Sequence, residues 1–278
     1  MLYKQKLLLL VISAIVAVAG GGLILKLMPA QFSMPINQSI PNPNVTSGVV
    51  PEEKNSTLEY IAQEVTVRIL TEPGSGSGVV IDRRGQNYTV LTNRHVVVKS
   101  KGNSYKVLTV DGQIHPARLK SEPNFQGIDL ALVEFASKIP YPKAKLGNSN
   151  TLSVGHKVYA TGFPNYRLIN KDNMEDTRNW GRKAFRFTTG KIARILQRSL
   201  LEGYSLGYTN EIELGMSGGP VFNEKGEVVG INGRLKYPIQ GIDAFTFVDG
   251  TKPSIEEFEK MESLSWAIPI SKYRQLAE

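Results

Sequence analysis

The feature that most constrains the fold of this chain is a series of short, β-branched runs between residues 65 and 270. Turn signals such as Pro73-Gly74 separate neighbouring runs, a pattern typical of a β-sandwich or of β-barrels. A break at residues 146–153 divides the series into halves of similar length. We therefore predict an all-β fold with short helices at its C-terminal end. The predicted strands are 65–70, 78–82, 88–92, 105–110, 114–119, 130–135, 157–161, 184–188, 191–196, 204–212, 227–231 and 265–270, and the predicted helical segments are 57–63, 253–261 and 271–277.

The amino-terminal segment differs from this series because it contains a long apolar run. Residues 7–25 carry no charge, follow Lys4 and Lys6, and approach the length at which a helix spans a bilayer. The run is either a signal anchor that holds the chain in a membrane or a signal peptide cleaved after Ala17-Val18-Ala19, which would leave a secreted protein. Both alternatives export the rest of the chain to the periplasm or another extracytoplasmic space. We expect residues 1–28 to form this signal, 29–57 a flexible linker, and 58–278 the folded domain.

Composition excludes several kinds of site. The chain has no cysteine, which excludes a disulfide scaffold, a cysteine nucleophile and thiolate metal ligands. Its three histidines include no closely spaced pair, so we expect no metal site, and no motif indicates a cofactor. The net charge of +8 is moderate, and without a basic and aromatic platform we expect no nucleic-acid partner. The basic residues between 167 and 198 form either a solvated surface or one that attracts an anionic membrane or an acidic substrate.

Three motifs occur in an order that indicates nucleophilic catalysis. His95 follows a predicted strand, Asp129 opens an apolar strand, and Ser217 lies in the glycine-rich turn 215–219. A serine hydroxyl needs a base, and the neutral imidazole of His95 can take its proton. A buried Asp129 can fix the tautomer of that imidazole and stabilise its protonated form. The backbone N–H groups of Gly215 and Ser217 can stabilise the oxyanion of a tetrahedral intermediate.

The segments around these residues resemble those of trypsin-like serine peptidases of the chymotrypsin fold. They read TNRHVV at 92–97, GIDLALV at 127–133 and GMSGGPV at 215–221. The chain is similar to the cysteine-free bacterial type, as in cyanobacterial trypsin-like proteins and in the protease domain of HtrA-type enzymes. The resemblance covers about residues 58–278. It implies two Greek-key six-stranded β-barrels, at about 64–146 and 154–270, with the catalytic groups in the cleft between them.

The resemblance also implies a role for each residue of the three motifs. His95 would be the general base, Asp129 its orienting partner, and Ser217 the nucleophile of an endopeptidase that acts on proteins or peptides through an acyl-enzyme. Gly215 and Ser217 would supply the oxyanion hole. The alternative is a catalytically silent peptide-binding or adaptor domain on the same fold. Its expected signature is a missing triad residue, and all three are present.

Substrate recognition is also inferred from the resemblance. The segment Ile231-Asn232-Gly233 would pair with the substrate backbone as an added strand, and residues 211–214 would line the first specificity pocket. Glu211 favours a basic substrate side chain if it points inward. Its neighbours Ile212 and Leu214 favour an apolar one, and the sequence leaves both alternatives open.

Departures from the family pattern carry expectations of their own. Met216 stands where digestive relatives have an aspartate that pairs with a freed amino terminus. Methionine offers no charge to a buried ammonium group, so we expect a chain that needs no proteolytic activation. We expect no PDZ-like domain after the last strand, and the polar segment 165–182 matches nothing that the resemblance implies.

Overall fold

The structure is a computed structural model that describes residues 51–72, 74–98, 100, 104–121, 123–170 and 173–277. The predicted signal at residues 1–28 and the linker up to residue 50 lie outside the described residues. Among the residues that are described, no helix is both long enough and apolar enough to cross a membrane.

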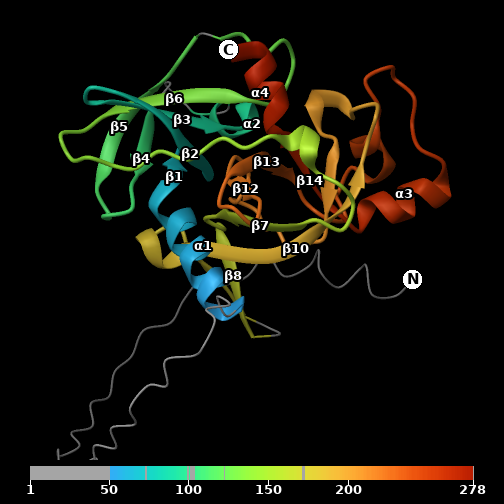
Figure 1. Ribbon diagram of the computed structural model, residues 1–278, viewed down its shortest axis with the longest axis horizontal. Coiled ribbons are helices and arrows are strands. Elements are labelled where there is room, and N and C mark those ends of the chain that lie inside the picture. The colour runs from blue at the N-terminus through green and yellow to red at the C-terminus, as the bar shows by residue number, and fades with distance from the viewer. Residues whose placement is uncertain are drawn as a thin grey trace, which may run out of the picture. The chain divides into compact units, whose positions relative to one another are not determined.

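The first barrel is a closed antiparallel sheet of six strands with the order β1-β2-β3-β6-β5-β4 (Figure 1). Its core is filled by side chains that alternate along the strands, among them Val67, Ile69 and Val133. The rings of Tyr88 and Phe135 stack inside it with centroids 5.0 Å apart. The strands are β1 (Thr66–Leu70), β2 (Ser75–Arg84), β3 (Asn87–Thr92), β4 (Tyr105–Leu108), β5 (Ile114–Leu119) and β6 (Ala131–Ala136).

The second barrel is also closed, with six antiparallel strands in the order β10-β11-β14-β13-β12-β7. The prediction of two six-stranded barrels is therefore confirmed. The runs predicted at 184–188 and 191–196 form one strand, because Gly190 keeps its place in the ladder opposite Val158. The strands are β7 (Lys157–Gly162), β10 (Arg186–Ile195), β11 (Leu206–Tyr208), β12 (Pro220–Phe222), β13 (Val228–Arg234) and β14 (Ser265–Pro269).

The strand predicted at 204–212 is wrong in extent, because only its central residues join the sheet as β11. The chain leaves the ladder around Asn210. The Asn210 side chain donates to the carbonyl oxygen of Thr188 over 2.8 Å, and its own carbonyl accepts a 2.8 Å hydrogen bond from Ser265 Oγ. These bonds replace strand pairing and turn the chain toward the glycine-rich segment.

Helices close the ends of the barrels. Helix α1 buries Leu58, Ala62 and Val65, a stripe with helical spacing. Residues 51–57, assigned to the linker by the sequence, form the first half of this helix. Helix α4 packs against β13 and β14 of the second barrel, and its Tyr273 ring lies 6.2 Å from the ring of Phe125 in the first barrel. Arg274 donates to the carbonyl oxygen of Leu146, between the barrels, over 3.0 Å. The helices are α1 (Pro51–Val65), α2 (Arg94–Val97), α3 (Ile255–Glu262) and α4 (Ile270–Ala277), with 3-10 turns η2 (Ser149–Thr151), η3 (Gly181–Ala184), η4 (Leu201–Gly203) and η5 (Gly241–Phe245).

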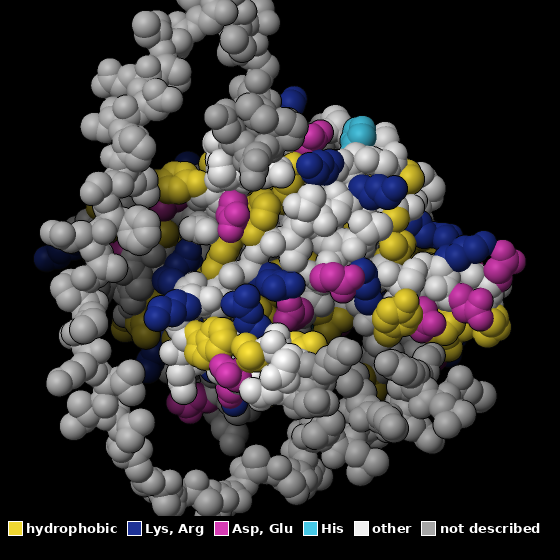
Figure 2. All heavy atoms as spheres, turned by 90° about the horizontal axis from the view of Figure 1, so that it is seen from below, with side chains coloured by type: hydrophobic (Ala, Val, Ile, Leu, Met, Phe, Trp, Pro, Cys, Tyr) yellow, Lys and Arg dark blue, Asp and Glu magenta, His cyan; other side chains and the backbone are white. Residues whose placement is uncertain are grey.

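The segment that the sequence left unassigned contains a separate two-stranded hairpin. Its strands are β8 (Tyr166–Asn170) and β9 (Asn173–Asp176), and their described side chains are exposed. The basic stretch around it is interleaved with acidic groups, and Figure 2 shows both signs mixed on one face. Ion pairs join Arg178 to Asp176, Arg186 to Glu213, Arg194 to Glu257 and Arg198 to Asp249.

Candidate active site

Asp129 and His95 form a pair joined by two hydrogen bonds. Asp129 precedes β6 and is only 4% exposed, whereas His95 lies in α2, directly after β3. The carboxylate accepts two hydrogen bonds from the histidine: 2.8 Å from the backbone N–H to Oδ1, and 2.6 Å from Nδ1 to Oδ2. Because an ionised carboxylate only accepts, the proton lies on Nδ1. Nε2 is left as the basic nitrogen of the ring.

A third donor to the same carboxylate comes from the second barrel. The hydroxyl group of Tyr204 donates to Asp129 Oδ2. Tyr204 is buried, and burial together with the negative charge of Asp129 raises its pKa well above the ordinary value, so the phenol stays protonated. Gly233 allows this approach, because a Cβ at that position would overlap the Tyr204 hydroxyl. No sequence pattern marks Tyr204 as part of the site, since a tyrosine among apolar residues is typical of any core.

Ser217 faces His95 across the cleft between the barrels. The two residues line one pocket of about 270 Å³, together with Ser75 and Leu214. Ser217 Oγ lies 3.5 Å from the carbonyl oxygen of Gly233. Within the described residues no hydrogen bond joins Ser217 Oγ to His95. In enzymes without substrate such contacts are often long and shorten when the substrate binds.

The loop at residues 213–217, called here the oxyanion loop, is held by its carbonyl groups. The Leu214 carbonyl accepts from the Asn165 N–H over 2.6 Å, and the Ser217 carbonyl accepts from the Ser77 N–H over 2.8 Å. The Gly215 carbonyl accepts from Ser77 Oγ over 2.8 Å. Among the described residues, the N–H groups of Gly215 and Ser217 have no acceptor. They are therefore available to an oxyanion.

Two residues explain the shape of this loop. Gly215 has a φ of +99°, and a Cβ there would lie 2.5 Å from the carbonyl oxygen of Phe163, so glycine is required both for backbone conformation and for space. Met216 is fully buried against Ile212 and Val221. The position that carries an aspartate in digestive relatives is thus filled here by an apolar anchor.

The predicted substrate-binding residues fall into two groups. Ile231 and Asn232 lie inside the barrel, where Ile231 is flanked by β12 and β14 and the Asn232 backbone bonds with Gly218 and Gly219. They do not line the pockets that contain His95. Gly233 does, because it lies beyond the last residue of β13 that pairs with β12.

Glu211 does not enter these pockets either. Its carboxylate forms an ion pair with Lys236, whose ammonium group also donates to the Thr209 carbonyl over 3.0 Å. Leu214, which is 63% exposed, lines both pockets that contain His95. The larger of the two, about 410 Å³, continues along apolar side chains that include Leu235 and Ile239.

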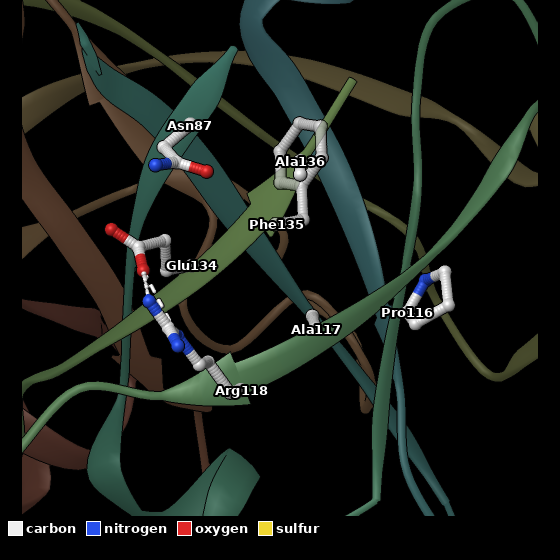
Figure 3. A pocket seen from close by; sticks show the side chains of 7 residues that line it. All are labelled: Asn87, Pro116, Ala117, Arg118, Glu134, Phe135 and Ala136. Atoms are coloured by element: carbon white, nitrogen blue, oxygen red, sulfur yellow. Dashed lines mark hydrogen bonds and ion pairs between the residues drawn. The ribbon is translucent and has the colours of Figure 1, made fainter. Parts of the chain in front are cut away.

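A further pocket lies on the first barrel, away from these residues (Figure 3). It is crossed by the ion pair between Arg118 on β5 and Glu134 on β6. No residue of the predicted triad lines it, so it plays no part in the site. Its lining residues are Asn87, Pro116, Ala117, Arg118, Glu134, Phe135 and Ala136.

Comparisons with known proteins find similarity to serine proteases. Residues 76–231 match the family model described as trypsin-like peptidase domain. The chain is 29% identical over 198 residues to the serine protease Do-like HtrA of Bacillus subtilis, covering 67% of this chain and 40% of that protein. It is 33% identical over 198 residues to the serine protease HTRA1 of Xenopus laevis, covering 68% and 36%. The chain thus matches about two fifths of the length of these relatives.

A solved structure shows the same fold. The serine endoprotease from Yersinia pestis superposes with a TM-score of 0.56 at 23% sequence identity, covering 81% of this chain and 65% of that one.

Proposed function

Because the chain belongs to the trypsin-like peptidase domain family, we propose that it is a serine endopeptidase that uses Ser217, His95 and Asp129. The observation that carries the proposal is the doubly hydrogen-bonded pair of Asp129 and His95, which leaves Nε2 basic on the side of the cleft that holds Ser217. A silent binding domain would have no use for a buried carboxylate that fixes the tautomer of a half-exposed histidine.

The proposed reaction proceeds in two halves. Ser217 Oγ attacks the peptide carbonyl carbon while its proton passes to His95 Nε2, and the carbonyl electron pair moves to the oxygen. The N–H groups of Gly215 and Ser217 bind that oxyanion. Collapse of the intermediate breaks the C–N bond, the leaving amine takes the proton from Nε2, and an ester remains on Ser217. A water molecule then repeats the sequence and releases the acid.

We propose that the substrate side chain next to the scissile carbonyl is apolar. The charge of Glu211 is engaged by Lys236, and the cleft is lined instead by Leu214 and Leu235.

We also propose that residues 1–28 direct export of the chain or anchor it in a membrane. The catalytic domain would then lie outside the cytoplasm.

The test is labelling with a fluorophosphonate, followed by location of the adduct by mass spectrometry. The proposal expects a single adduct on Ser217, loss of labelling in Ser217→Ala and in His95→Ala, and cleavage of unfolded protein substrates by the wild type only. An intact, folded wild type that neither labels nor cleaves would identify the silent binding domain instead.

A further inference from the structure

A buried arginine lies behind the oxyanion loop, at the junction of the two barrels. Arg68 on β1 is fully buried, and burial lowers its pKa to about 10, so the guanidinium is still charged at neutral pH. A buried cation is expensive unless its donors are satisfied. The buried guanidinium of Arg68 must therefore have oxygen acceptors around it.

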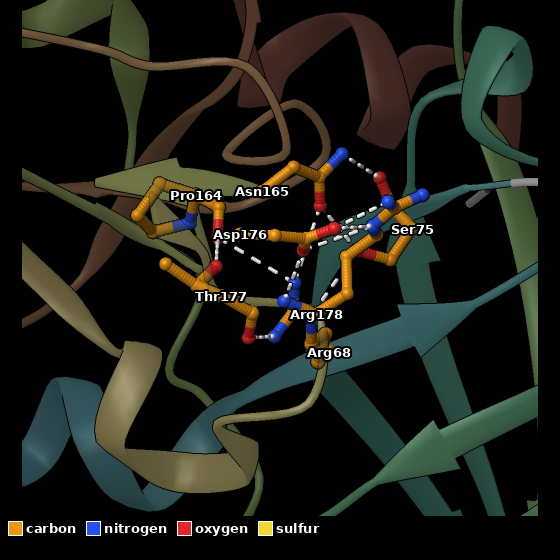
Figure 4. A network of polar contacts seen from close by, with 7 residues as sticks. All are labelled: Arg68, Ser75, Pro164, Asn165, Asp176, Thr177 and Arg178. Carbon is orange, nitrogen blue, oxygen red and sulfur yellow. Dashed lines mark hydrogen bonds and ion pairs between the residues drawn. The ribbon is translucent and has the colours of Figure 1, made fainter. Parts of the chain in front are cut away.

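The donors of Arg68 are satisfied by oxygens from both barrels (Figure 4). Nε donates to Ser75 Oγ on β2 over 3.1 Å. Nη1 donates to the Thr177 carbonyl over 2.8 Å, and Nη2 donates to Asn165 Oδ1 over 3.2 Å and to the Pro164 carbonyl over 3.5 Å. The planar fork of a guanidinium group can reach all of these oxygens at once, and a lysine ammonium cannot.

Asn165 connects this cluster to the catalytic loop. Its side chain is held at both ends: Oδ1 accepts from Arg68 and from Ser75 Oγ, and Nδ2 donates to the Ser75 carbonyl over 3.2 Å. Its backbone N–H donates to the Leu214 carbonyl over 2.6 Å. A Cβ on Gly215 would lie 2.7 Å from the same nitrogen. The peptide of Asn165 therefore packs directly against the oxyanion loop.

We propose that Arg68 is a positioning residue that fixes the oxyanion loop through Asn165. The proposal rests on the proposed function. Arg68 touches no reacting atom. Its cation orients the amide of Asn165, and this in turn holds Leu214 and Gly215 so that the N–H groups of Gly215 and Ser217 face the cleft.

The β8–β9 hairpin takes part in the cluster. Asp176, the last residue of β9, forms an ion pair with Arg178, and its negative charge also favours the charged form of Arg68. Thr177 follows at once, and its N–H donates to the Asn165 carbonyl over 2.9 Å. The exposed hairpin is thus attached to Arg68 and Asn165 at its base.

The test is the variant Arg68→Met, with Arg182→Met as its matched control. Arg182 is also an arginine whose pKa burial lowers, and it donates to the carbonyls of Thr66 and Gln63 over 3.0 and 2.9 Å, neither of which belongs to the oxyanion loop. We expect Arg68→Met to lower kcat on the order of 100-fold, as for loss of an oxyanion donor, with KM nearly unchanged. A peptide aldehyde, which mimics the tetrahedral state, should lose affinity by the same factor. Arg182→Met should change neither.

Hydrogen exchange provides a readout that does not depend on activity. Amides of residues 211–218 should exchange faster in Arg68→Met than in the wild type or in Arg182→Met. If the wild type proved inactive, the proposed function would fail and exchange alone would decide the role of Arg68. Wild-type kcat in a folded Arg68→Met, or unchanged exchange in that segment, would overturn the inference. Should Arg68→Met not fold, Arg68→Lys decides in the same assays: an intermediate loss of kcat supports the role, and wild-type kcat refutes it.

Discussion

The hydroxyl group of Tyr204 and the imidazole of His95 donate to the same oxygen of Asp129, from opposite barrels. The tyrosine is contributed by the second barrel and the histidine by the first. The carboxylate is therefore oriented by the way in which the two barrels meet, and not by its own strand alone.

Removing that hydroxyl should weaken catalysis without opening a cavity. We expect Tyr204→Phe to lower kcat/KM about 10- to 100-fold, because a hydrogen bond to a charged group contributes about 1.5–3 kcal/mol. Tyr88→Phe is the control, since Tyr88 is equally buried but donates to the Ile139 carbonyl over 3.0 Å. Equal kcat/KM in both variants and the wild type would exclude a role for Tyr204.

Ser217→Ala should abolish turnover while leaving the fold intact. Within the part of the chain that the structure describes, the Ser217 hydroxyl makes one weak hydrogen bond, of 3.5 Å, whereas loss of the nucleophile in a comparable triad lowers kcat on the order of 10⁶-fold. Steady-state cleavage and circular dichroism of the same sample measure both effects. Residual activity above a few per cent of wild type would remove Ser217 from its proposed role.

Acid should destabilise the fold through paired carboxylates. The hydrogen bond from Lys145 to Glu227, at 2.7 Å, and a bond from Asn223 lower the pKa of Glu227. The pKa of Glu227 is therefore lower in the native protein than in the unfolded chain, and the unfolded chain binds the proton first as the pH falls. The stabilisation is present above the unfolded pKa and is lost as the pH falls through the native pKa. Glu227→Gln should lower the free energy of unfolding by less than about 1 kcal/mol at pH 7, because Lys145 is exposed, and by a smaller amount at pH 3. Urea unfolding at both pH values tests this, and an equal loss at both would contradict the electrostatic explanation.

Truncation should show where the folded domain begins. Removal of residues 1–50 is expected to leave stability and activity unchanged. Removal of residues 1–57 cuts into α1 and breaks the 3.2 Å bond between Tyr159 and Asn55, with a loss of about 1 kcal/mol. Thermal unfolding of the two shortened chains measures the difference. If both were as stable as the full chain, the first half of α1 would have no structural role.

Activity should not depend on a free amino terminus. The carbonyls of Leu214, Gly215 and Ser217 are already bound by Asn165 and Ser77. A chain with a blocked amino terminus should therefore match one trimmed to Pro51 in kcat. Activity that appeared only after trimming would mean that the oxyanion loop needs a charged terminus after all.

The sequence predicted those parts of the molecule that are encoded locally. His95, Asp129 and Ser217 each stand in a recognisable segment, and most strands coincide with short β-branched runs between turn signals. Strand β12 was not predicted, because three residues are too few to form a pattern. The hairpin β8–β9 was not predicted either, because neither of its faces is buried and its strands therefore lack an apolar face.

The support of the site could not be predicted, because it depends on contacts between distant segments. Arg68 and Asn165 lie 97 positions apart, and nothing near Arg68 in the sequence indicates that its side chain is buried. Tyr204 likewise lies 75 residues from Asp129 in the sequence, although its hydroxyl group donates to that carboxylate. Such pairs become visible only when the barrels are brought together.

Burial of Met216 has a consequence for how such an enzyme is kept in check. Where a salt bridge formed by cleavage completes the site, the cell can store an inert precursor and release it on demand. An apolar anchor is set in place by folding itself, so we predict that no inert precursor of this kind is stored. We then expect restraint to come from outside the catalytic domain, through where the protein is delivered and which polypeptides are unfolded enough to reach its cleft.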